Sequence, residues 1–93
     1  MAFVITKPLE EHKIEAIARV NAKAGDKITI LYPIYRQLNI GREPTSSEAI
    51  TMYTYIDSIR DLSNTATNSI NLATTVAQVR EIEATFTISL LSI

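Results

Sequence analysis

The stretch Ala49–Ala77, AITMYTYIDSIRDLSNTATNSINLATTVA, decides how this chain folds. Nine of its residues follow one another in alternating steps of three and four: Ala49, Met52, Ile56, Ile59, Ser63, Ala66, Ile70, Ala73 and Ala77. This spacing places these nine residues, the seam, along one stripe of a helix, near the roughly 3.5-residue repeat of a coiled coil. Because a stripe this long needs a surface to pack against, the seam predicts a mainly α fold built around one long amphipathic helix.

The helix that carries the seam is expected to span residues of about 46–84. Thr45-Ser46-Ser47-Glu48 matches a capping box, in which the threonine hydroxyl accepts from an unpaired backbone N–H and the glutamate reaches back. The second half of this helix is rich in Ser, Thr and Asn, which are poor helix formers and need packing. Its last part, about Ile70 to Val79, extends past the preceding helical region. We expect it to pack against another copy, another protein or the terminal strands, with a contact between molecules favoured.

Before the seam, apolar residues recur at helical spacing over a region of about 8–38, and residues 39–44 form a linker. Within this region, Lys27–Tyr32 allows two interpretations. Its β-branched content favours a strand after Gly25, whereas the spacing of its apolar residues favours a continued helix. Pro33 ends or kinks either one.

Both ends of the chain have the pattern of short strands. Phe86, Ile88 and Leu90 alternate with Thr and Ser, which predicts a strand over residues 85–92. Ala2–Ile5 is a short apolar run that reads as an edge strand. The sequence therefore predicts a mainly α helical hairpin with one long amphipathic helix and short β-strands at the N- and C-termini.

Size and composition narrow the classes of function. The chain has 93 residues, 46% of them hydrophobic, and a formal net charge of −1, so it forms a single small domain. There is no basic block or stripe, which argues against nucleic acid as a partner. No run approaches the roughly 18 apolar residues of a membrane span, and the N-terminus lacks the basic segment of a signal peptide. We therefore expect no membrane partner and a cytoplasmic protein.

Chemistry-bearing residues are sparse. The chain has no cysteine, two glycines and one histidine, His12, which lies in a charged segment typical of a solvated helix turn. Asp57, Arg60 and Asp61 have the spacing of an ion-pair face on a helix, with no nucleophile that can be placed beside them. We therefore expect no catalytic residues, no metal site and no cofactor.

Two groups of residues are candidates for binding another protein. The first lies around the loop between the helices, where tyrosine and arginine, both common at interface hot spots, occur together: Tyr32, Tyr35, Arg36 and Tyr55. Packing between the two helices is the other interpretation of these tyrosines, and it is the favoured one. Tyr53, beside the seam, is expected to pack, and Tyr55, away from it, is the better candidate for contact. The second group comes from the end of the seam and the expected strand: Ile70, Val76, Val79, Phe86, Ile88 and Leu90.

Two segments, Ala22–Ile28 and Leu31–Asn39, resemble in sequence the small tail-fibre assembly and tail-associated proteins of tailed bacteriophages. The second segment contains YPIYRQLN. In that family a polar linker follows, and after it comes a second helix whose sequence is similar to Tyr55–Asn64 here. The resemblance covers about Ala16–Asn68. It implies that the segment before the tyrosine-proline pair is helical, which favours the helical interpretation of Lys27–Tyr32.

The resemblance implies a non-enzymatic protein that binds a tail-fibre or baseplate polypeptide, as an assembly chaperone or an attachment factor. Such a protein would act in the cytoplasm of a bacterial host during assembly, or in the virion. Two alternatives remain open. One is a structural protein of the virion that assembles with itself through the seam. The other is a small inhibitor or antitoxin-like regulator that binds another protein.

Overall fold

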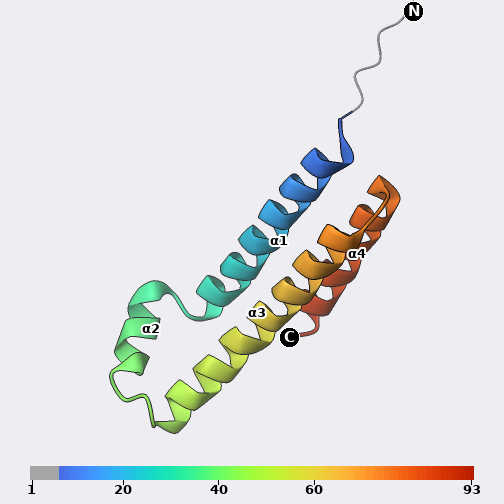
Figure 1. Ribbon diagram of the computed structural model, residues 1–93. Coiled ribbons are helices and arrows are strands. Elements are labelled where there is room, and N and C mark those ends of the chain that lie inside the picture. The colour runs from blue at the N-terminus through green and yellow to red at the C-terminus, as the bar shows by residue number, and fades with distance from the viewer. Residues whose placement is uncertain (1–6) are drawn as a thin grey trace, which may run out of the picture.

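The computed structural model describes residues 7–93, and within that range the chain forms helices only (Figure 1). These are α1 (Leu9–Leu31), α2 (Ile34–Gly41), α3 (Ser47–Leu72) and α4 (Val76–Leu91). The long helices α1 and α3 run antiparallel, and α4 folds back along α3 so that it runs parallel to α1. The short helix α2 packs against α3 at the opposite end from the α3–α4 turn. The mainly α prediction is confirmed.

The prediction of a C-terminal strand over residues 85–92 is wrong, because this segment belongs to α4. Val79, Phe86 and Leu90 are buried, and their steps of seven and four place them on one helical face. The segment therefore fits two patterns, an alternation of apolar and hydroxyl residues and a helical spacing of its larger side chains. The structure follows the helical one. The predicted strand Ala2–Ile5 lies outside the described residues.

The predicted helix over residues 46–84 is also wrong, since the chain breaks between Leu72 and Val76. Thr75 is extended and caps α4, because its Oγ1 accepts from the backbone N–H of Gln78 at 3.2 Å. In return, Gln78 Oε1 accepts from the backbone N–H of Thr74 at 2.8 Å. These two bonds resemble a capping box, except that the glutamine side chain bonds to the residue before the N-cap and not to the N-cap itself. Because of this turn, α4 packs against α3, which carries the seam.

The first helical region is divided at Pro33. Helix α1 continues through Lys27–Leu31, so the helical interpretation of this segment is confirmed up to Leu31. Proline lacks an N–H and disfavours a helical residue before it, which explains why Tyr32 leaves the helix and α2 starts afresh. Helix α2 takes up the first residues of the expected linker. The helix α3 is capped by Ser46, not by Thr45, because Ser46 Oγ accepts from the N–H of Ala49 at 3.1 Å.

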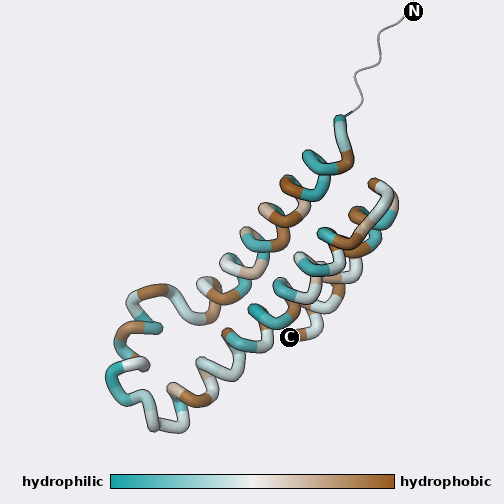
Figure 2. The backbone as a smooth tube through the Cα atoms, in the orientation of Figure 1, coloured by the Kyte–Doolittle hydropathy of each residue, from teal (hydrophilic) through white to brown (hydrophobic). Residues whose placement is uncertain are grey.

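The seam lies in the core along its whole course through α3. Eight of its nine residues are buried, namely Ala49, Met52, Ile56, Ile59, Ser63, Ala66, Ile70 and Ala73. Ala77, the ninth, is exposed on α4. The buried residues form two clusters, one among α1, α3 and α4 and the other between α3 and the α1–α2 connection, and Ile28 and Tyr55 pack against both. Figure 2 shows hydrophobic residues at intervals along α1 and α3, between hydrophilic ones.

Polar contacts fix the register of the three long helices. Arg19 Nε donates to Glu83 Oε1 at 2.6 Å, and Lys23 Nζ donates to Thr87 Oγ1 at 3.0 Å, so both pairs join α1 to α4 at the same separation of 64 residues. The buried Lys13 donates through Nζ to the backbone oxygen of Asn71 at 3.0 Å. That oxygen belongs to the last turn of α3, where carbonyls lack helical partners and a cation is favoured.

Candidate protein-binding surfaces

The tyrosines of the first predicted group brace the connection between α1 and α2. Tyr32 is buried, and its ring centroid lies 5.6 Å from that of Tyr55. The Tyr55 hydroxyl donates to the backbone oxygen of Lys27 at 3.3 Å. The Arg36 guanidinium lies 5.1 Å from the centre of the Tyr32 ring and donates to the backbone oxygen of Leu31 at 2.9 Å. Tyr32 and Tyr55 therefore hold the α1–α2 connection in place and are not exposed contact residues.

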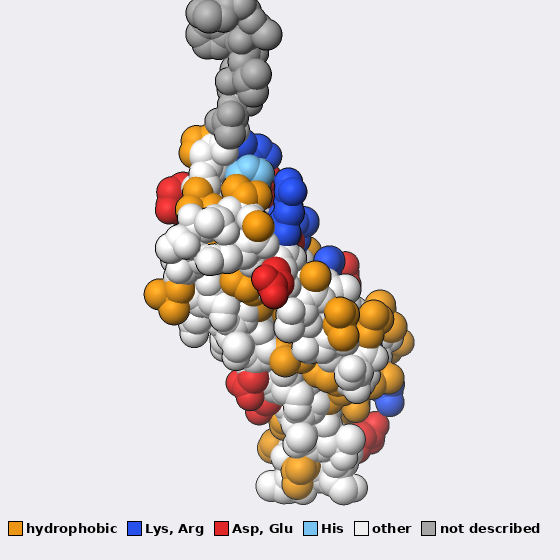
Figure 3. All heavy atoms as spheres, turned by 90° about the vertical axis from the view of Figure 1, so that its right-hand side faces the viewer, with side chains coloured by type: hydrophobic (Ala, Val, Ile, Leu, Met, Phe, Trp, Pro, Cys, Tyr) orange, Lys and Arg blue, Asp and Glu red, His pale blue; other side chains and the backbone are white. Residues whose placement is uncertain are grey.

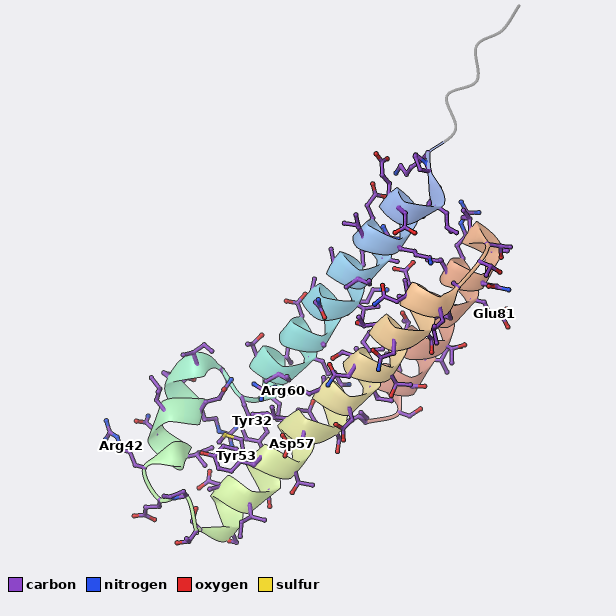
Figure 4. All side chains as sticks on the ribbon, in the orientation of Figure 1. Tyr32, Arg42, Tyr53, Asp57, Arg60 and Glu81 are labelled. Carbon is purple, nitrogen blue, oxygen red and sulfur yellow. The ribbon has the colours of Figure 1, made fainter. Side chains whose placement is uncertain are left out.

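The burial of Tyr53 and Tyr55 is the reverse of the expectation. Tyr55 is half-buried and packs against both core clusters, whereas Tyr53 is exposed. Figure 4 shows Tyr32 and Tyr53 between α2 and α3, with Arg42 at the outer end of α2. Tyr35 and Arg36 remain on the surface, as the sequence predicts for contact residues.

Most of the second predicted group lies inside the bundle. Ile70, Val79, Phe86 and Leu90 are buried in the cluster shared by α1, α3 and α4. Val76 is half-buried, and only Ile88 of the group is exposed. The part of the seam that was expected to contact another polypeptide is therefore covered by α4 of the same chain.

A group of exposed apolar residues surrounds the connection between α1 and α2. We call it the elbow surface, and it consists of Ile30, Leu31, Ile34, Tyr35 and Leu38, each between 44% and 81% exposed. Within α2, the side chains of Ile34, Tyr35 and Leu38 share one face, whereas Ile40 points to the core. Helix α2 therefore turns its apolar face to solvent. Helix α2 lies on the left of Figure 1, so Figure 3, which shows the molecule from the right-hand side of that view, looks at the opposite side from this surface.

Tyr53 and Ile50 extend this surface onto α3. Gly41 continues the row of Ile34 and Leu38 along α2 at helical spacing, and a β carbon placed on Gly41 would lie only 3.2 Å from Tyr53 Oη. Tyr53 thus borders the apolar face of α2. Ile50, exposed one turn earlier on α3, lies on the same side of that helix as Tyr53.

A second candidate surface is a groove between α3 and α4, with a cavity volume of about 250 Å³. The apolar lining residues are Leu62, Ala66, Ile82 and Phe86, and the hydroxyl-bearing ones are Thr65, Ser69, Thr85 and Ser89. Glu81 is the charged residue of the lining. The groove is thus an apolar trough with small polar side chains along it.

The side chains considered above for chemistry lie on α1 and α3. Within residues 7–93, no three His, Cys, Asp or Glu side chains are grouped so that they could hold a metal ion. Asp57, Arg60 and Asp61 are exposed on α3, and Figure 4 shows Asp57 and Arg60 near its middle. His12 is half-buried in the first turns of α1. No helix of the described chain combines the length and the apolar character that crossing a bilayer requires.

The groove was not anticipated from the sequence, because it exists only when α4 folds back on α3. The signal that reveals it is Thr75-Val76-Ala77-Gln78, a capping-box pattern inside the segment whose apolar spacing predicts one continuous helix. Comparison with protein-family models, with curated proteins and with solved structures finds no match to this chain.

Proposed function

We propose that this chain is a non-enzymatic protein-binding module that holds a helix of another polypeptide in the groove between α3 and α4. The observation that carries the proposal is the groove itself, whose lining includes the apolar side chains of Leu62, Ile82 and Phe86. Recognition of an amphipathic helix by an apolar groove is a common mode of protein binding.

The side chains along the groove favour a helix as the occupant. Ala66 and Ser69 on α3 and Ser89 on α4 are small, so the backbone of a bound helix can come close to both α3 and α4. A helix laid there would complete a four-helix arrangement with α1, α3 and α4. Glu81 is exposed, and it is in no ion pair among the described residues. The bound helix is therefore expected to carry a lysine or arginine opposite Glu81.

The resemblance of the α1–α2 region to phage tail-associated proteins provides the partner class. We propose that the bound helix belongs to a tail-fibre or baseplate polypeptide, and that the chain assists its folding or its attachment. Binding would require only burial of apolar surface and one ion pair, with no nucleotide or metal.

The test is co-purification with the fibre and baseplate polypeptides encoded beside the gene for this chain. Thr85 is exposed and lines the groove, so Thr85→Trp fills the groove without entering the core. Thr29→Trp, on the exposed side of α1, is the matched control. We expect the control to bind like the unaltered chain and Thr85→Trp to lose the partner at an unchanged melting temperature. Equal binding by both variants would place the contact elsewhere, and the absence of fibre or baseplate genes would remove the proposed partner.

A further inference from the structure

We infer that the elbow surface is the contact between two copies of this chain, which form a two-fold symmetric dimer through their α2 helices. The first reason is the orientation of α2. An amphipathic helix normally turns its apolar face to the core, but Ile34, Tyr35 and Leu38 are each more than 60% exposed while Ile40 is buried. This orientation leaves apolar area exposed in the monomer that a second molecule would cover.

Within residues 7–93 no helix covers this face, since its apolar side chains are exposed. Helix α4 ends at Leu91, and among the described helices only α3 packs closely against α2. The apolar side chains of α2 are therefore free to contact another molecule.

The size of the surface matches what a stable dimer needs. The elbow surface together with Ile50 and Tyr53 comprises seven large apolar side chains, each at least 43% exposed. At about 200 Å² for a fully exposed large side chain, a partner that covered all seven would bury at most roughly 800 Å² of them. A standard-size interface buries about 800 Å² on each partner. Exposed apolar patches beyond a few hundred Å² usually mark interaction sites.

The charges around the surface favour a second copy over a foreign partner of one charge sign. From Ile30 to Tyr53 the charged residues are Arg36, Arg42, Glu43 and Glu48, which sum to zero. Arg36 Nη2 and Glu48 Oε1 are 4.0 Å apart, and both side chains are largely exposed. A two-fold axis brings each patch against itself. Each arginine can then meet a glutamate of the second copy.

Light scattering after size-exclusion chromatography, over a wide range of concentrations, measures the mass directly. We expect a dimer whose dissociation constant rises roughly 100-fold or more in Leu38→Glu, because the substitution occurs twice in a symmetric dimer. Leu72→Glu, at an exposed leucine on the last turn of α3, is the matched control and should leave the dimer intact. A monomer at every concentration up to about 1 mM overturns the inference. A dimer that Leu72→Glu breaks and Leu38→Glu does not also overturns it.

A mixing experiment tests the symmetry of the contact. Arg36→Glu gives a chain with carboxylates at both positions, and Glu48→Arg gives a chain with guanidinium groups at both. We expect each variant alone to dimerise at least tenfold more weakly, and an equimolar mixture to form a heterodimer of normal affinity, since opposite charges then face each other across the axis. If mixing restores nothing while both variants keep their helical circular dichroism, the two patches do not face each other. Partner binding in the groove is unaffected by either result, because Thr85 lies on the other half of the molecule.

Discussion

The half of the molecule that contains α4 and the half that contains α2 use the same two long helices in different ways. In the first half, α1, α3 and α4 enclose a core in which isoleucines such as Ile59 and Ile70 are fully buried. In the second half, α4 has ended and only the short α2 accompanies α1 and α3, so Ile30 and Ile34 are exposed. The comparison teaches that burial depends on which face of a helix a residue occupies and on what packs over that face, and not on its apolar character alone.

The strongest test of this comparison removes the same atoms from each half. We expect Ile70→Ala to cost about 3 kcal/mol of the free energy of unfolding, because it leaves a cavity among three helices. Ile34→Ala, on the exposed face of α2, is expected to cost less than about 0.5 kcal/mol when dimerisation is suppressed by dilution. Urea unfolding followed by circular dichroism measures both values. Similar losses for the two variants would mean that Ile34 is covered in the monomer as well.

The second test concerns the turn that creates the three-helix half. Thr75→Ala removes the hydroxyl that accepts from the N–H of Gln78, and we expect a loss of about 1 kcal/mol, typical for an N-cap threonine. In the elbow half, the Thr51 hydroxyl only bonds back to the oxygen of Ser47 inside α3. Thr51→Ala should therefore be neutral or slightly stabilising, since alanine is the better helix former. A neutral Thr75→Ala would show that packing alone positions the start of α4.

The two halves also differ in how far the sequence predicts them. The seam was predictable to the residue along α3, because its spacing admits only one helical face and every seam residue from Ala49 to Ala73 is buried. The break at Ala73–Thr75 was not, because apolar steps of three and four continue across it to Ala77. The strand expected at residues 85–92 failed for a related reason. A short alternation of apolar and hydroxyl residues fits both periods, and the neighbouring helices decide between them.

The candidate surfaces were predictable only in part. Tyr35 and Arg36 lie on the elbow surface or at its rim, but nothing in the sequence separates them from Tyr32, which is buried against Tyr55. Which side of α2 faces the core depends on how α2 docks on α3, and that docking involves residues far apart in the sequence. The groove depends in the same way on the return of α4.

The third test uses the two glycines, one in each half. Gly25 lies within α1, and a β carbon there would have no atom within 4 Å, so no close approach in the monomer requires glycine. We expect Gly25→Ala to raise the free energy of unfolding by up to about 1 kcal/mol through its helix propensity. Gly41→Ala should bring no comparable gain, because its β carbon would lie 3.2 Å from Tyr53 Oη. Thermal melts of both variants test the difference, which equal stabilisation by both would contradict.

The smallest expected effect concerns the ion pairs, whose shorter contacts belong to the three-helix half. Lys7 Nζ donates to both carboxylate oxygens of Glu15, at 2.9 and 2.8 Å, whereas the Arg36–Glu48 pair of the elbow is separated by 4.0 Å. The hydrogen bond from Lys7 lowers the pKa of Glu15 below its ordinary value, and the charges of Lys7 and Arg19 act in the same direction. The pair is exposed, so salt screens it.

The direction of the pH dependence follows from this lowered pKa. Because the unfolded chain binds the proton on Glu15 more readily, the contribution of the pair is present at neutral pH and above the unfolded pKa. It is lost as the pH falls through the lower pKa of the folded state. The melting temperatures of the unaltered chain and Glu15→Gln should therefore converge on acidification, and at neutral pH they should converge with added salt. Lys7→Gln should lower the melting temperature at neutral pH by a similar amount, and the double variant should lose no more than either single one. Additive losses would mean that Lys7 and Glu15 act separately, and the contrast in ionic contacts between the two halves would then have no energetic counterpart.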